Sequence, residues 1–212
     1  MYRYPYPHPA VATDVAIFTL RDGALAVLLI RRKGEPFEGA WALPGGFLKE
    51  DEDLDACAAR ELSEEAGLSA GVLQHFGNFS APERDPRERV ISVAYFALVS
   101  SDRVTPEAGS DAAEARWFAI SSLPALAFDH TEIVQRALVA LRSGLLTSDI
   151  LLALLPARFT LSSLQEAFEA VSGEAADKRN FRKRIIGSGI VRESDEFERG
   201  SHRPARLYER AV

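Results

Sequence analysis

Residues 46–68 read GFLKEDEDLDACAARELSEEAGL, and this stretch decides the fold of the first part of the chain. The acidic residues at 51–53 favour a helix start, because carboxylates interact well with the free N–H groups there. Alanine, leucine and glutamate continue the helix, and Gly67 suits the left-handed residue that ends one. The spacing therefore predicts a helix that turns Leu54 and Leu62 toward a core.

Three carboxylates of this helix, Glu61, Glu64 and Glu65, fall within an arc of roughly 100°. Carboxylates so close together repel one another unless a cation lies between them, and Mg²⁺ prefers oxygen ligands of this kind. The alternative interpretation is an acidic, solvated helix face, which is the usual explanation for a run of glutamates. An isolated ExxEE pattern would favour that alternative.

The complete spacing resembles the Nudix box: Gly46, five residues, Glu52, seven residues, and then RELSEEAGL at 60–68. Every fixed position of that pattern is filled, so chance is a poor explanation. The resemblance implies a loop–helix–loop that holds Mg²⁺ or Mn²⁺ against a diphosphate. With ADP-ribose as the substrate, hydrolysis would yield AMP and ribose 5-phosphate.

The same resemblance implies a role for each residue of the box. Glu64 and Glu65 would ligate the metal, with Glu61 either a third ligand or the base for the attacking water. Arg60 would orient these carboxylates. The positions that complete the ligand set or shape the loop are Gly45 through its carbonyl, Gly46, Glu52 and Gly67.

The composition fits a globular protein of one or two domains, with 212 residues of which 47% are hydrophobic. Its charge of −6 is uneven, since residues 1–144 carry 14 basic and 21 acidic side chains and residues 145–212 carry 11 and 10. A single cysteine, Cys57, excludes an internal disulfide. No signal peptide or long apolar run is visible, which predicts a cytoplasmic protein without a membrane segment.

The rest of the first part alternates β-rich and helical segments. Residues 11–20 and 24–30 predict a hairpin around the turn at 21–23. Further strands are expected at 72–79, 90–99 and 114–118, followed by a helix at 130–142. The predicted fold class is α/β, an α/β/α Nudix sandwich with a mixed sheet over residues 1–145.

A proline-punctuated, arginine-rich loop, APERDPRER at 81–89, separates two of these strands. It is either a solvated hairpin tip or a substrate loop whose arginines pair with phosphates. It resembles the RDPR-type loop of Nudix proteins that handle ADP-ribose. The candidate effector-binding residues are Arg31, Arg32, Arg84, Asp85 and Arg87, and Glu107 or Asp111 is a candidate extra metal ligand.

The end of the chain, residues 146–212, has a different character. A helix capped by Thr160 or Ser162, a second helix at 178–186, and a hairpin of 190–193 with 205–209 predict a winged helix-turn-helix domain. The second helix is strongly basic, which favours DNA. A solvated face or a protein-binding winged domain is the alternative.

Three segments, at 158–165, 177–183 and 202–208, resemble NrtR, the Nudix-related transcriptional regulators. This resemblance implies a homodimeric repressor, often of NAD-synthesis genes, that binds a double-stranded operator and senses ADP-ribose or a related nucleotide. Carried over to this chain, the expected DNA-binding residues are Lys178, Arg179, Asn180, Arg182 and Lys183 on the second helix, and His202 and Arg203 on the wing.

Many regulators of this type have a decayed Nudix box, whereas the box at 60–65 is intact here. This difference predicts metal binding and leaves hydrolysis open. Two other hypotheses remain. The chain is a plain Nudix pyrophosphatase whose C-terminal domain serves dimerisation, or it is a regulator that senses a pentose instead of a nucleotide.

Overall fold

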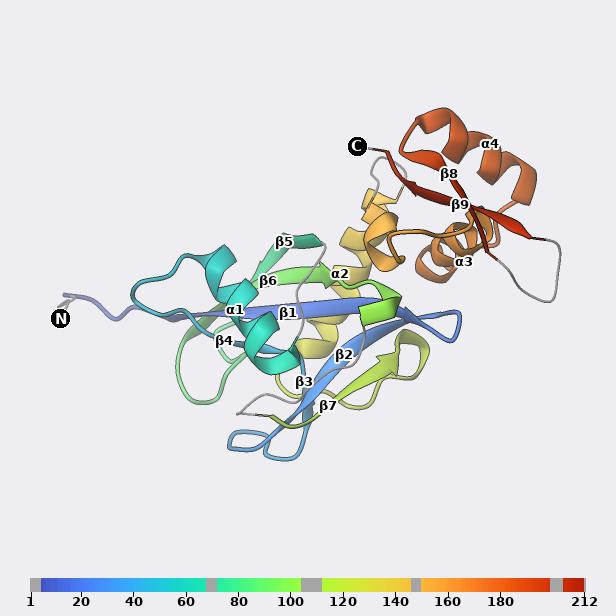
Figure 1. The fold of residues 1–212 in the computed structure, drawn as a ribbon. Helices are drawn as coiled ribbons and strands as arrows, with labels where there is room; N and C mark the ends of the chain where they lie inside the picture. Colours follow the sequence, from blue (N-terminus) through green and yellow to red (C-terminus); the bar gives the residue numbers. More distant parts are fainter. Residues whose placement is uncertain (1–4, 68–71, 104–111, 146–149, 199–203, 212) are drawn as a thin grey trace.

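A computed structural model describes residues 5–67, 72–103, 112–145, 150–198 and 204–211. Its first part is built on a mixed sheet with the strand order β3-β2-β1-β6-β5 (Figure 1). β4 pairs with β1 and β7 pairs with β2; among these strand pairs of the described residues, β1–β6 is parallel and the others are antiparallel. The strand bounds are β1 Ala10–Arg21, β2 Ala24–Arg32, β3 Trp41–Ala42, β4 Gly45–Phe47, β5 Val72–Phe79, β6 Val90–Leu98 and β7 Ala112–Ala119.

The predicted β1–β2 hairpin is confirmed, and its turn is tight. Arg21 pairs with Ala24, which leaves Asp22 and Gly23 as the loop. Their φ angles of 50° and 76° are both positive, as a two-residue type I′ turn requires. This turn fixes the register that buries both faces of β1 and β2.

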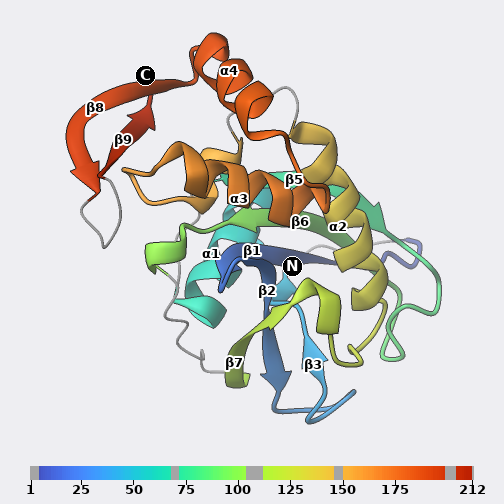
Figure 2. The ribbon, with the colours of Figure 1, turned by 90° about the vertical axis from the view of Figure 1, so that its right-hand side faces the viewer.

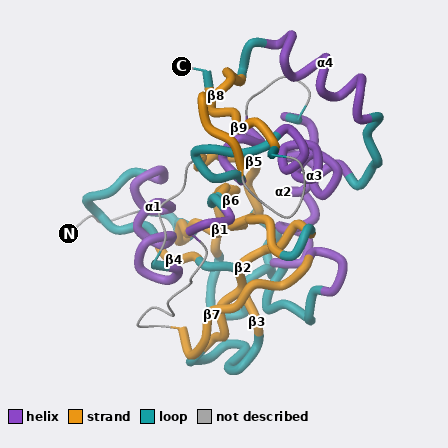
Figure 3. Tube along the Cα trace, turned by 45° about the vertical axis from the view of Figure 1, so that its right-hand side comes forward, coloured by secondary structure: helices purple, strands orange, loops and turns teal. Residues whose placement is uncertain are grey.

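Two helices cover opposite faces of the sheet, α1 (Leu54–Ala66) and α2 (His130–Gly144), as Figure 3 shows. Alternate residues of β1 serve the two layers, because successive side chains of a strand point to opposite faces. Val15 and Ile17 pack in the cluster that contains Leu62 of α1, and Phe18 packs in the cluster that contains Ile133 of α2. The expected α/β/α sandwich is confirmed.

The C-terminal part is a winged helix, also as predicted. It comprises α3 (Leu161–Ser172), α4 (Lys178–Ser188) and a hairpin of β8 (Val191–Glu198) with β9 (Ala205–Arg210). Thr160 is the N-cap of α3, and its hydroxyl accepts a hydrogen bond from the Ser163 N–H at 3.0 Å. α4 and the first strand of the hairpin both extend beyond their predicted ends. α4 continues to Ser188, where Gly189 ends it in a left-handed conformation, and β8 continues to Glu198.

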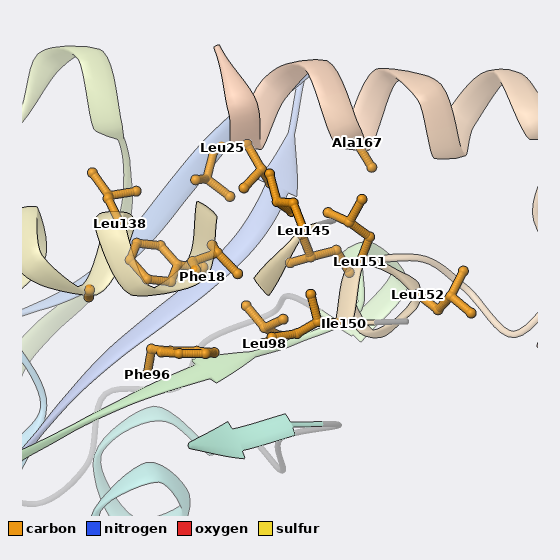
Figure 4. Close-up of a cluster of buried hydrophobic side chains, with 14 of the residues drawn as sticks. Phe18, Leu25, Phe96, Leu98, Leu138, Leu145, Ile150, Leu151, Leu152 and Ala167 are labelled. Carbon is orange, nitrogen blue, oxygen red and sulfur yellow. The ribbon is translucent and has the colours of Figure 1, made fainter. Parts of the chain in front are cut away.

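The two parts share one hydrophobic core. The chain contains short 3-10 helices at Ser101–Arg103 (η1), Ile120–Ser122 (η2) and Ile150–Leu154 (η3), and η3 belongs to this core. η3 places Leu151 between Leu145 after α2 and Ala167 of α3 (Figure 4). The winged helix thus packs against the α2 side of the sheet, away from α1, as Figures 1 and 2 show. A domain limit at 145/146 stays a prediction.

This shared core yields a stability prediction. We expect Leu151→Ala to lower the free energy of unfolding by about 2–5 kcal/mol, because it leaves a cavity at the junction of both parts. Urea unfolding followed by circular dichroism measures the change. Val139→Ala is the matched control, since Val139 on α2 is 68% exposed. A loss below about 0.5 kcal/mol for Leu151→Ala, the range of surface substitutions, would contradict the shared core.

Candidate functional site

The helix α1 begins and ends where the box predicts. Asp53 is its N-cap, and the carboxylate accepts a hydrogen bond from the Ala56 N–H at 2.8 Å. Gly67 ends the helix with φ 63° and donates its N–H to the Ser63 carbonyl. The buried residues Ala58 and Leu62 hold α1 on the sheet, so the carboxylates of its last two turns meet the loop before it.

Arg60 ties this helix to its own preceding loop. Its guanidinium binds both carboxylate oxygens of Glu52, at 2.9 and 2.6 Å. The remaining nitrogen, Nη1, donates to Glu61 at 2.5 Å and to Glu64 at 3.0 Å. The hydrogen bonds from Arg60 lower the pKa of Glu52 to about 2. Burial raises the pKa of Glu61 above its ordinary range, against the opposing effect of Arg60.

Two glycines let the backbone come close to these carboxylates. Gly45 donates its N–H to Glu65 Oε2 at 2.9 Å, and a Cβ at this position would collide with the Thr13 carbonyl oxygen. At Gly46, a Cβ would collide with the carboxylate of Glu61. Gly45 therefore requires glycine so that two stretches of backbone can approach closely, whereas a side chain at Gly46 would force the buried Glu61 carboxylate to move.

The predicted metal ligands are neighbours, but they do not form a ready ligand set. Within the described ranges, no three His, Cys, Asp or Glu side chains are arranged to hold a metal ion. The physical reason is electrostatic: clustered carboxylates need a cation, and here Arg60 provides it for Glu61 and Glu64. The oxygen donors of this cluster suit a hard divalent ion.

These groups line one wall of a cavity of about 730 Å³, within the range of nucleotide and cofactor sites. Arg32, Lys33 and Arg87 bring positive charge to the same cavity. Ile30 and Leu43 add apolar surface. The remaining lining residues are Ala12, Asp14, Gly34, Gly45, Gly46, Phe47, Lys49, Arg60, Glu61, Glu64, Glu65, Phe128 and His130.

The predicted effector-binding residues divide into two groups. Arg32 and Arg87 line the cavity. Asp85 is buried and holds the Arg87 guanidinium at 2.7 and 3.0 Å, so its role is to position that arginine. Arg31 lies outside the lining and donates to the Gly39 carbonyl at 3.1 Å.

Among the predicted effector-binding residues, Arg84 differs most clearly from the prediction. Its side chain is only 4% exposed and binds Asp129 at 2.7 and 2.9 Å and Asp14 at 3.1 Å. Because both carboxylates occupy it, Arg84 anchors the 81–89 loop to β1 and α2 and does not face the cavity. A phosphate-binding role for Arg84 therefore does not fit this structure.

The sequence did not predict the cluster of buried polar side chains around Asp14. Ser92 donates to Asp14 Oδ2 at 2.5 Å, and His130 Nε2 lies 3.3 Å from Asp14 Oδ1. The Leu43 N–H donates to His130 Nδ1 at 2.9 Å, which leaves the proton of the neutral ring on Nε2, facing Asp14. The available signal was a lone aspartate within the otherwise apolar strand TDVAIF at 13–18.

His130 gives the stability of the protein a defined pH dependence. Burial lowers the pKa of its imidazole below the ordinary range. As the pH falls below about 6.5, the unfolded chain binds a proton there that the folded chain excludes, so the free energy of unfolding falls. We expect His130→Gln to remove this contribution in urea titrations between pH 7.5 and 5.5. His75→Gln, at an exposed position of β5, is the control, and equal slopes for wild type and His130→Gln would refute the assignment.

The basic helix α4 presents most of its predicted DNA-binding residues to solvent. Its N-cap is Asp177, which accepts the Asn180 N–H at 2.9 Å, and Phe181 and Ile185 hold it against the core. Lys178, Arg179, Asn180 and Lys183 are all exposed.

Arg182 differs from the prediction, because Nη2 donates to Ser162 of α3 at 3.1 Å and the side chain is partly buried. In this structure it joins the two helices. His202 and Arg203 on the wing, and the candidate ligands Glu107 and Asp111, lie outside the described residues. None of the helices in the described ranges combines the length and the apolar character of a membrane span.

Both parts of the chain are similar to known protein families. The family model of the NUDIX domain matches residues 10–137, and that of the NrtR DNA-binding winged helix domain matches residues 151–209. The ADPR responsive transcriptional repressor NtrR of Acinetobacter baylyi is 36% identical over 211 residues, which is 98% of this chain and 84% of that protein. An ADP-ribose pyrophosphatase of Methanocaldococcus jannaschii is 43% identical over 130 residues, 61% of this chain and 73% of that protein.

The likeness extends to the arrangement of both parts in space. The crystal structure of Shewanella oneidensis NrtR complexed with a 27mer DNA matches with a TM-score of 0.84 and 28% identity. That match covers 95% of this chain and 93% of the other. The chain therefore belongs to the NrtR family of Nudix-related transcriptional regulators, with a NUDIX domain followed by a DNA-binding winged helix.

Proposed function

We propose that this chain is a transcriptional repressor that releases its operator when ADP-ribose binds in the Nudix cavity. One observation carries the proposal: a nucleotide-sized cavity and an exposed basic helix are built on a single hydrophobic core. The family supports the ligand, since one relative is an ADPR responsive repressor and another an ADP-ribose pyrophosphatase. Control of NAD-synthesis genes stays a prediction from the sequence.

The helix α2 provides a physical route between the two sites. At its first turn, His130 lines the cavity and binds Asp14. Near its end, Arg142 Nε donates to the Val171 carbonyl of α3 at 2.8 Å. A ligand that shifts the start of α2 therefore acts on the helix-turn-helix through packed side chains and one hydrogen bond.

The complete box supports a second activity, hydrolysis of the bound nucleotide. When bound, Mg²⁺ or Mn²⁺ would neutralise the diphosphate and activate a water. Glu61 suits the role of base, because burial raises its pKa toward the working range of a proton acceptor. Arg60 fixes the orientation of Glu61 and Glu64, and Arg87 faces the anionic ligand from the cationic side of the cavity.

The DNA-binding winged helix also favours a homodimer. A recognition helix reads one half-site, so two copies related by a two-fold axis read a palindrome. We propose that this regulator binds a palindromic operator as a dimer. Sedimentation of the complex with a single operator duplex measures the stoichiometry directly.

The experiment that tests the function is a gel shift of the operator, with and without ADP-ribose, first in EDTA and then in Mg²⁺. Release in EDTA that fades with time in Mg²⁺, as AMP accumulates, identifies a sensor that also destroys its signal. Stable release in both identifies a sensor whose box is idle. No DNA binding together with AMP release would make the chain an enzyme and overturn the repressor proposal.

A further inference from the structure

The sequence of α3, LSSLQEAFEAVS, contains no basic residue, and a guanidinium from α2 binds its C-terminal end. The last carbonyl groups of a helix have no intrahelical partners and carry partial negative charge, so a nearby cationic donor stabilises them. Arg142 of α2 donates its Nε–H to the Val171 carbonyl at 2.8 Å. Its Nη2 reaches Gly173, where an added Cβ would lie 3.9 Å away. The end of α3 is therefore stabilised by a side chain from the first part of the chain.

This end of α3 begins the turn that leads to the basic helix α4. Gly173 ends α3 with φ 78° and donates its N–H to the Glu169 carbonyl at 2.9 Å. The Glu169 carboxylate accepts hydrogen bonds from the Ala176 N–H and from Gln165 Nε2, both at 2.9 Å. Gln165 Nε2 also donates to the Ala176 carbonyl at 2.9 Å. These bonds hold the turn onto α3, so a shift of the end of α3 moves the start of α4 with it.

The hydrogen bond of Arg142 adds direction to a contact that is otherwise made by apolar side chains. Leu141 of α2 belongs to the same buried cluster as Leu164 and Ala167 of α3. Packed apolar faces of helices permit small sliding movements. A hydrogen bond instead requires a defined distance and angle. The bond from Arg142 to Val171 therefore selects one position of α3 along α2.

The other end of α2 is joined to a loop that lines the cavity. The N-cap residue Asp129 makes no capping hydrogen bond with its side chain, and Arg84 holds its carboxylate instead at 2.7 and 2.9 Å. Arg84 belongs to the same loop as Arg87, which lines the cavity together with His130. A ligand that moves this loop therefore moves the start of α2. From His130 to Arg142 the helix is about 18 Å long, since each residue adds about 1.5 Å.

We propose that Arg142 is the positioning residue that couples the Nudix cavity to the DNA-binding helix α4. A movement of α2 changes the geometry of the Arg142–Val171 hydrogen bond, and the turn after α3 carries that change to α4. This inference rests on the proposed function, and it assigns the coupling to one side chain that does not line the cavity and does not belong to α4.

The experiment measures the coupling factor, which is the ratio of the operator Kd with saturating ADP-ribose to the Kd without it, in EDTA. Fluorescence anisotropy gives both values with a labelled operator duplex that the wild type has selected from random sequences. We expect Arg142→Met to lower the coupling factor by about 2- to 30-fold, because methionine keeps an unbranched side chain but has no N–H donor. Arg142 is exposed as a whole, so the substitution leaves the core intact.

Two readouts distinguish coupling from a general structural role. Calorimetry without DNA should give the wild-type affinity for ADP-ribose in Arg142→Met. Coupling is reciprocal, so saturating operator should weaken ADP-ribose binding to the wild type by the same factor, and less so in the variant. Arg142→Lys should restore part of the coupling, since lysine keeps the positive charge and N–H donors.

Arg136→Met is the matched control. Arg136 lies on the same helix, but its guanidinium lies over the Phe79 ring at 4.6 Å, away from α3. An unchanged coupling factor in Arg142→Met, or an equal decrease in Arg136→Met, would overturn the proposal. A loss of ADP-ribose affinity without DNA that equals the loss of coupling would also overturn it, because Arg142 would then act on the cavity.

Hydrogen exchange without DNA separates this inference from the repressor proposal. ADP-ribose should change the exchange rate of the Gly173 amide in the wild type and in Arg136→Met but not in Arg142→Met. If it does so without releasing the operator, the repressor function fails and the role of Arg142 stands. If ADP-ribose releases the operator from the wild type and from Arg142→Met by the same factor, the role of Arg142 is refuted and the repressor stands. No change of exchange in the wild type would overturn the coupling through this turn.

Discussion

We expect the double variant Arg179→Ala/Lys183→Ala to bind operator DNA about 100-fold more weakly than the wild type at physiological salt. Both side chains are exposed on α4, whose opposite face is anchored by Phe181 and Ile185. Phosphate neutralisation dominates affinity for DNA, and each lost contact lowers the salt dependence of binding. Fluorescence anisotropy with a labelled operator across a salt series measures affinity and slope together.

The control for this variant removes the same charge from elsewhere. Arg116→Ala/Arg136→Ala changes two exposed arginines of the first part of the chain and should leave the salt slope unchanged. The α4 variant should still bind ADP-ribose in calorimetry, which shows that the fold is intact. An equal loss of operator affinity in both double variants would mean that net charge, not α4, drives the binding.

Much of this architecture follows from local sequence signals. The β1–β2 turn, the caps of α1 and α3, and the glycines that end α1 and α4 act over a few residues. Helical periodicity then turns Leu54 and Leu62 toward the core without knowledge of their partners. The Nudix box is recognisable for the same reason, since all its residues lie in one loop and helix.

The polar contacts of the site could not be predicted, because they join distant parts of the chain. Arg84 pairs with Asp14 and Asp129, which lie 70 and 45 positions away. His130 accepts a hydrogen bond from Leu43 across 87 positions. An arginine in a polar loop looks solvated in the sequence, and only the packing of β1, β6 and α2 shows that it is buried.

The box itself shows the limit of a local pattern. Its spacing places Glu61, Glu64 and Glu65 on one arc of α1, and the structure agrees. The pattern does not show how that charge is balanced without a metal. Arg60 does so by binding Glu52, Glu61 and Glu64 together, an arrangement that depends on the loop at 46–53 folding back onto the helix.

The second large effect is expected for Glu65→Gln, which should reduce both Mn²⁺ binding and metal-dependent AMP release by at least about 100-fold. Glu65 is buried beside the cavity and accepts the Gly45 N–H at 2.9 Å. Glutamine has the same shape and keeps an oxygen for that hydrogen bond, so the fold is retained while the negative charge needed by a divalent ion is lost. Titration calorimetry with Mn²⁺ and chromatography of AMP give independent readouts.

Comparison with Glu132→Gln, an exposed carboxylate on α2, separates loss of a ligand from loss of one negative charge. ADP-ribose binding in EDTA should survive both substitutions, because it does not depend on the metal. Unchanged Mn²⁺ affinity in Glu65→Gln would remove Glu65 from the ligand set. Full Mn²⁺ binding by the wild type without AMP release would instead mean that the intact box binds the metal but does not hydrolyse ADP-ribose.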